Sequence, residues 1–89
     1  MALLSVHHSR YRALQSELAR LRRQADLSQV QLAERLGVGQ SFISKIERGE
    51  AYVDLWFFAD WCQACGARAG AVLDALTAHV KRPALDVRR

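Results

Sequence analysis

Small polar and basic side chains recur at helical spacing in the middle of this 89-residue chain. They fall on the outer face of a short helix that we expect to begin near Gln40, while Ile43 and Ile46 fall on its inner face. Amide, hydroxyl and amine groups on an exposed helix can hydrogen-bond to the base edges and phosphates of DNA. This face could therefore bind a nucleic acid through hydrogen bonds.

The residues before this helix carry the signals that would position it. Ser28, followed three residues later by Gln31, forms a capping box, which predicts the start of a preceding helix. Gly37 predicts the end of that helix, and Ala33 is small enough for the next helix to cross close above it. A helix, a three-residue turn and a second helix make a helix-turn-helix, whose second helix enters the DNA major groove.

The segment Leu27–Gly49 resembles the lambda-repressor-like (Cro/XRE-type) DNA-binding domain. The features matched are a Gln and Leu-Ala in the first helix of the motif, a glycine turn and Ile-Ser-Lys-Ile-Glu-Arg-Gly, at Gln29, Leu32, Ala33, Gly37 and Ile43–Gly49. This match covers about a quarter of the chain, and a looser match in hydrophobic spacing extends over roughly residues 11–80. The resemblance implies an all-α, compact five-helix domain in which helices 2 and 3 form the helix-turn-helix.

The same resemblance implies which residues meet DNA. Base edges would be read from the outer face of the third helix by Gln40, Ser41, Ser44 and Lys45. Gln40 suits adenine N6 and N7, whereas Lys45 suits guanine O6 and N7 or a phosphate. Phosphate contacts are expected at adjoining helix ends, from Gln29, Arg23 and Arg48. Phe42 is grouped with these backbone contacts, although it could equally meet a thymine methyl or shield the turn.

A structural ion pair also follows from the resemblance. In the family, an arginine of the first helix pairs with the glutamate of Ile-Glu-Arg-Gly, and these positions are Arg22 and Glu47 here. The pair would brace the first helix against the third and affect DNA binding only indirectly. Removing one partner of such a semi-buried pair should cost several kcal/mol.

Size and charge limit the classes of function. The length allows one small domain, without room for a separate catalytic domain, and we expect neither catalysis nor a cofactor nor a metal. Residues 1–49 carry eight Arg and Lys against four Asp and Glu, whereas residues 50–89 carry five of each. The excess positive charge thus lies in the half with the predicted DNA-reading unit. No 18-residue apolar run and no signal peptide is found, so a cytoplasmic protein is expected.

Apolar spacing and helix signals predict the remaining elements and the domain bounds. The first helix is expected to begin near Ser9 or Arg10. The five expected helices cover about residues 10–24, 29–36, 40–48, 55–65 and 68–81. Asp54 is the predicted cap of the fourth helix, and Pro83 prevents extension of the fifth. We divide the chain into an N-terminal arm (1–9), a helix-turn-helix domain with C-terminal dimerisation helices (10–82) and a tail (83–89).

A second resemblance points to different chemistry. Residues 53–66 resemble the active-site stretch of thioredoxin-like oxidoreductases, with Trp-Cys-x-x-Cys at Cys62 and Cys65. Only 24 residues follow Cys65, too few for the rest of that fold, and Pro83 has no later strand to support a cis-proline loop. Helical spacing places four residues on one apolar face: Leu55, Phe58, Cys62 and Cys65. We therefore expect core cysteines, with a redox enzyme, or a Zn²⁺ site that adds His79, as the alternatives.

The fourth helix carries more apolar residues than one core face needs, and Trp56 falls on the side of Asp60 and Gln63. Small domains rarely expose such a set without a partner. We predict a homodimer interface made by Trp56, Phe57, Trp61, Val72, Leu76 and Val80. The alternative is that Trp56 is one exposed aromatic residue.

Together these features favour a sequence-specific transcriptional regulator, a dimeric repressor that binds a palindromic operator in double-stranded DNA through its third helix. The alternative is an antitoxin that neutralises a partner toxin and autoregulates its operon. In that case Trp56, Phe57 and the C-terminal tail would contact the toxin, and a toxin gene beside this one would distinguish the two hypotheses.

Overall fold

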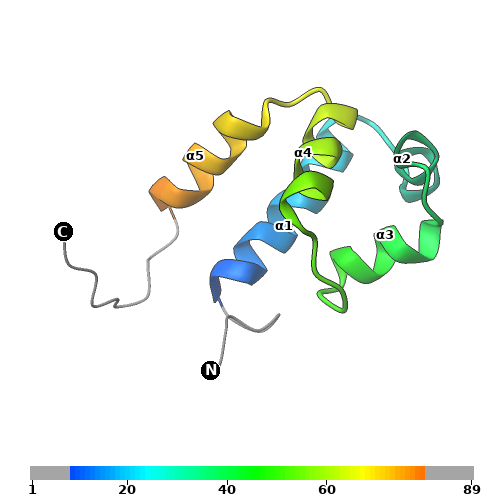
Figure 1. The fold of residues 1–89 in the computed structure, drawn as a ribbon, viewed down its shortest axis with the longest axis horizontal. Coiled ribbons are helices and arrows are strands. Elements are labelled where there is room, and N and C mark those ends of the chain that lie inside the picture. The colour runs from blue at the N-terminus through cyan, green and yellow to red at the C-terminus, as the bar shows by residue number, and fades with distance from the viewer. Residues whose placement is uncertain (1–8, 80–89) are drawn as a thin grey trace.

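The computed structural model describes residues 9–79, which form five helices: α1 (Ser9–Gln24), α2 (Gln29–Leu36), α3 (Gln40–Glu47), α4 (Leu55–Ala64) and α5 (Ala69–His79). α2 and α3 gather at one end of the domain, α1 and α4 cross in the middle, and α5 lies at the other end (Figure 1). α2 packs against α3 and α4, α1 packs against α3 and α4, and α5 packs against α4. The predicted all-α, five-helix fold is confirmed, and residues 9–79 contain no strand.

The helix bounds agree with the sequence pattern to within one residue wherever the structure describes them. Arg48 and Cys65, predicted as the last helical residues of α3 and α4, are instead the residues that cap these helices. The capping side chain of Asp54 accepts a hydrogen bond from the backbone N–H of Phe57 at 2.8 Å. The end predicted for α5, most of the arm and the whole of the tail lie outside the described residues.

The first four helices end in the same way. In each, a backbone N–H reaches back to the carbonyl five residues earlier, in the pairs Leu27–Arg22, Val38–Ala33, Glu50–Lys45 and Ala67–Cys62. This Schellman closure needs one residue in the left-handed region, and the four residues are Asp26, Gly37, Gly49 and Gly66. α1 is therefore the only one of the four that ends without a glycine.

The core is assembled from one face of each helix. Six side chains are completely buried: Leu18, Leu32, Ile43, Ile46, Trp61 and Cys62. The indole Nε1 of Trp61 donates to the carbonyl of Leu18 at 3.0 Å, so the largest core side chain leaves no buried donor unpaired.

One face of α1 fixes the position of α3 and of the loop that follows it. The Tyr11 hydroxyl donates to the carbonyl of Ala51 and accepts from the N–H of Val53, both at 3.1 Å. One turn further along α1, Gln15 Nε2 donates to the backbone carbonyl of Glu47 at 2.7 Å. Residues 11, 15, 18 and 22 are spaced by four, three and four, which is the spacing of one helical face. α1 thus supports α3 and its exit loop along its length.

Burial corrects three predictions about the fourth and fifth helices. Trp61 is 0% exposed and bonded to α1, so its placement in a dimer interface is wrong. Val72 is buried in the same core and cannot serve such an interface either. Leu55, predicted to share a buried face with Phe58, is instead 69% exposed at the first residue of α4. Val80 lies outside the described residues.

Candidate DNA interface

The start of α2 is fixed by a reciprocal cap. The backbone N–H of Gln31 donates to Ser28 Oγ at 3.0 Å, and the backbone N–H of Ser28 donates to Gln31 Oε1 at 2.8 Å. The predicted capping box is therefore present and satisfies two amide groups that a helix start leaves without partners. At the other end of α2, Gly37 has φ 70° and turns the chain toward α3.

α3 separates an apolar face from a polar one. Ile43 and Ile46 are completely buried, α3 packs against α2, and the side chain of Ala33 on α2 is also buried. The outer face carries the four predicted base readers, of which Gln40, Ser41 and Lys45 are exposed and Ser44 is half-buried. The structure thus brings together on one accessible surface the residues that the resemblance implies.

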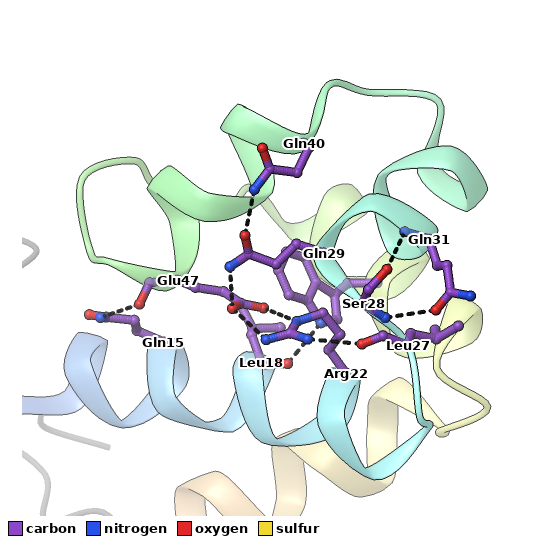
Figure 2. Close-up of polar contacts among 10 residues, drawn as sticks. Gln15, Leu18, Arg22, Leu27, Ser28, Gln29, Gln31, Gln40 and Glu47 are labelled. Atoms are coloured by element: carbon purple, nitrogen blue, oxygen red, sulfur yellow. Dashed lines mark hydrogen bonds and ion pairs between the residues drawn. The ribbon is translucent and has the colours of Figure 1, made fainter.

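A column of polar side chains runs from the start of α3 down to α1 (Figure 2). Gln40 Nε2 donates to Gln29 Oε1 at 2.6 Å, and Gln29 Nε2 donates to Glu47 Oε1 at 3.0 Å. Glu47 also accepts from Arg22 Nε at 2.7 Å and from Arg22 Nη2 at 3.0 Å. A further bond, from Arg22 Nη1 to the carbonyl of Leu27 at 2.8 Å, ties the column to the chain between α1 and α2.

The ion pair between Arg22 and Glu47 lies where the resemblance implies it. The two side chains are 13% and 8% exposed, and the guanidinium binds the carboxylate through two nitrogens. The hydrogen bond to Glu47 raises the pKa of Arg22 above its ordinary value. Arg22 therefore stays protonated, and its two bonds to Glu47 hold α1 against α3.

Gln29 has a different environment from the one expected. Its carboxamide is engaged on both sides, by Gln40 and by Glu47, so the side chain that is predicted to meet a phosphate also supports α3. The bond between Gln29 and Gln40 crosses the turn between two helices. Spacing within either helix carries no signal for it.

The remaining phosphate candidates lie around the same surface. Arg23 is exposed in the last turn of α1, and Arg48 is exposed at the end of α3. Phe42 lies between α3 and α4, with its ring centroid 5.5 Å from that of Phe57. Because Phe57 in turn contacts Trp61, Phe42 continues an aromatic row that begins in the core. This placement favours the shielding role for Phe42.

The cysteines are in surroundings that oppose redox chemistry. Burial raises the pKa of Cys62 to about 11 and raises the pKa of Cys65 as well, whereas a nucleophilic cysteine needs a lowered pKa. Cys62 lies within α4, away from the helix N-terminus that activates such a thiol. Within residues 9–78 no three His, Cys, Asp or Glu side chains are grouped as metal ligands, and the side chain of His79, the third ligand of the Zn²⁺ alternative, lies outside the description.

Comparison with known proteins agrees with this geometry. A family model described as a helix-turn-helix domain matches residues 13–76, which is more than half of the chain. An XRE-family-like protein from Pseudomonas syringae is 39% identical and superposes with a TM-score of 0.79 over 85% of this chain and 93% of that one. The chain belongs to the Cro/XRE-type helix-turn-helix family.

Two further solved structures are similar to this Cro/XRE-type domain. Both are of the clp gene regulator ClgR from Corynebacterium glutamicum, at 30% identity, and the match covers 75% of this chain. It covers 86% of one ClgR chain and 71% of the other, with TM-scores of 0.67 and 0.68. Among curated proteins, none matches. Family membership identifies the chain as a DNA-binding transcriptional regulator, and no helix in residues 9–79 has the length and apolar content that a membrane span needs.

Proposed function

We propose that this domain is a repressor that occupies a two-fold operator and reads each half-site with Gln40, Ser41, Ser44 and Lys45. The observation that carries the proposal is the hydrogen bond from Gln40 to Gln29. It uses one of the two amide hydrogens of Gln40 and leaves the other hydrogen and Oε1 for a partner. Those two groups complement N7 and the N6 amino group of adenine, which make the pair that a glutamine reads in the major groove.

The column below Gln40 supports this reading because it orders the side chain before DNA arrives. A glutamine side chain that becomes fixed on binding loses up to roughly 1.5–2 kcal/mol of rotamer entropy. Here Gln29 already restricts Gln40, and Glu47 restricts Gln29. The function needs no catalysis and no cofactor, and we place it in the cytoplasm, where the DNA of a bacterial operon lies.

The test is a salt series of binding to the DNA upstream of the gene and to a random duplex of equal length. A base-reading protein binds the upstream site at least about a thousandfold more tightly than random DNA at physiological salt. Both affinities fall as salt rises, because each phosphate contact releases counterions. Equal affinities for the two duplexes at every salt concentration would contradict the proposal.

Because Trp61 and Val72 are buried, we propose a dimer interface made by the apolar side chains that stay exposed on α4 and α5. Trp56 is 77% exposed and follows the exposed Leu55, and Leu73 is exposed on α5. Leu55 and Leu73 also line a mostly apolar hollow of about 320 Å³, together with Tyr11, Phe58 and Leu76. We assign this surface to a second copy, because helix-turn-helix dimers place two recognition helices on half-sites roughly 34 Å apart.

Sedimentation at tens of micromolar tests this assignment. Wild type should sediment as a dimer, and Trp56→Arg should sediment as a monomer of 10.0 kDa with an unchanged circular dichroism spectrum. Ser16→Arg, which adds the same charge at an exposed position of α1 outside this surface, is the control and should stay dimeric. A wild-type monomer would contradict the dimer, and tight binding of a protein encoded next to the gene would favour the antitoxin alternative.

A further inference from the structure

An exposed ion pair closes the end of the recognition helix. Arg48 caps α3, and Gly49, with φ 78°, turns the chain so that Glu50 lies beside Arg48. Arg48 Nε donates to Glu50 Oε2 and Arg48 Nη2 donates to Glu50 Oε1, both at 3.0 Å. The remaining terminal nitrogen, Nη1, donates to the hydroxyl of Ser44. All three guanidinium nitrogens are thus engaged within the chain.

This pair lies on the surface that would face DNA. Gln40, Ser44 and Arg48 are spaced by four residues, so Arg48 continues the outer stripe of α3 one turn beyond Ser44. The buried Ile43 and Ile46 mark the opposite side. The side chains of Arg48 and Glu50 are 53% and 55% exposed, which leaves both open to exchange with a ligand in solution.

The geometry of the pair is that of an arginine on a phosphate. A carboxylate and a phosphate both offer two oxygens to the guanidinium fork, and arginine binds either one through two parallel hydrogen bonds. The contact with Arg48 lowers the pKa of Glu50, so the carboxylate is charged at neutral pH. Because an exposed pair is worth little in water, an incoming phosphate can displace it.

We propose that Glu50 is an intramolecular stand-in for a DNA phosphate. Glu50 holds Arg48 in the free protein and gives it up when the domain binds a duplex, so it lowers the affinity of this surface for DNA of any sequence. This inference rests on the proposed function, since it assumes that the outer face of α3 meets DNA. Phosphate contacts carry no direct sequence information, so Glu50 limits affinity and leaves base preference unchanged.

Two roles of Glu50 predict opposite changes in DNA affinity when its charge is removed. If Glu50 served to aim Arg48 at the DNA, its removal would loosen Arg48 and weaken binding. If Glu50 competes with phosphate, its removal releases Arg48 and also removes a negative charge that repels the duplex. A single neutral substitution therefore separates the two roles by the direction of the change.

The experiment measures dissociation constants of wild type, Glu50→Gln, Arg48→Gln and the double variant on a random duplex and on the upstream site, over about 50–300 mM salt. Asp74→Asn is the control, because it makes the same charge change on the exposed side of α5, away from α3. Thermal unfolding of each variant confirms that the comparison is between folded proteins.

Glu50→Gln should bind both duplexes about 1.5- to 5-fold more tightly than Asp74→Asn does, which is the range expected from releasing one exposed pair. The slope of log K against log salt should steepen by about 0.9, the contribution of one more phosphate contact. The gain should disappear in the Arg48→Gln background. Weaker binding by Glu50→Gln, a change no larger than that of Asp74→Asn, or a gain that persists without Arg48 would each overturn the inference.

Failure of the proposed function gives a different result. In that case wild type would bind the upstream site and the random duplex equally, whatever the sign of the Glu50→Gln effect. The ratio of the two affinities thus tests the function, and the shift between Glu50→Gln and Asp74→Asn tests the role of Glu50.

Discussion

Gln40 Nε2 donates to Gln29 Oε1 over 2.6 Å, across the turn that joins α2 to α3. The bond links the first residue of the recognition helix to the first residue of the helix that supports it. Since Gln29 is itself held by Glu47, and Glu47 by Arg22, the orientation of one exposed amide depends on a pair of charges almost buried between α1 and α3. The base contact proposed for Gln40 and the stability of the domain therefore depend on the same column of side chains.

Gln29→Ala tests this coupling. Without Gln29, the Gln40 side chain regains its rotamers, and we expect affinity for the upstream site to fall by about 1 kcal/mol, or roughly fivefold, while binding to random DNA changes less than twofold. Fluorescence anisotropy on the two duplexes measures both. Gln63→Ala, an exposed glutamine on α4, should leave both affinities unchanged. An equal loss on both duplexes would mean that Gln29 acts through the phosphates.

The ion pair at the base of the column predicts a large loss of stability. Arg22→Ala leaves Glu47 almost buried without its partner, and we expect the free energy of unfolding to fall by about 3 kcal/mol. Arg20→Ala removes an exposed pair with Glu17 from the same helix and should cost less than about 1 kcal/mol. Urea unfolding of the two variants gives the comparison, and similar losses would contradict the role assigned to Arg22.

Much of the fold could be predicted from short-range patterns. The helix signals depend on neighbours within four residues, so they can be recognised in the sequence alone. They are the capping box at Ser28, the glycine at position 37 and the cap at Asp54, and the helix bounds predicted from them agree to within one residue. The four base-reading candidates came from the family resemblance, and α3 places them together on its outer face.

What could not be predicted depends on contacts between helices. Trp61 is buried because its indole meets the carbonyl of Leu18, 43 residues earlier, and a helical wheel of α4 alone carries no such information. Leu55 is exposed although its spacing puts it on the same helical face as the buried Phe58. The bond between Gln29 and Gln40 likewise depends on how two helices are joined by their turn.

Backbone conformation gives a prediction at the helix ends. Asp26 occupies a left-handed position, φ 59°, where the three other closures have glycine. Asp26→Gly should raise the free energy of unfolding by about 0.5–1 kcal/mol, because the left-handed region penalises a side chain by roughly 1–2 kcal/mol and glycine loses some chain entropy. Thermal unfolding measures the gain, and a loss of stability would show that the Asp26 side chain has a role of its own.

Replacing glycine by alanine at two helix ends gives a matched comparison. A Cβ at Gly37 would meet nothing within 4 Å, so Gly37→Ala should cost only the left-handed penalty of about 1–2 kcal/mol. A Cβ at Gly49 would lie 2.6 Å from Gln15 Oε1 and disturb the bond from Gln15 to the carbonyl of Glu47. Gly49→Ala should therefore cost about 1 kcal/mol more than Gly37→Ala. Equal costs in urea unfolding would argue that Gln15 does not hold α3.

The buried thiol of Cys62 predicts how stability depends on pH. Burial raises its pKa from 9.0 to about 11, so the folded state holds this proton more tightly than the unfolded chain does. The resulting stabilisation is complete below pH 9 and is lost as the pH rises from 9 to 11, to a total of about 2–3 kcal/mol. Cys62→Ala should lack this part of the alkaline decline, although its stability at neutral pH will be lower. Parallel declines for the two proteins would contradict a buried, protonated Cys62.

The most direct test of base reading by α3 compares Gln40→Ala and Lys45→Ala with wild type on the upstream site and on random DNA at one fixed salt concentration. Both side chains are exposed, so neither change should alter the fold. We predict losses of about 1–3 kcal/mol on the upstream site and little change on random DNA for Gln40→Ala, because a base contact is lost and no phosphate contact is. Unchanged discrimination between the two duplexes in both variants would contradict the assignment of α3 as the reading helix.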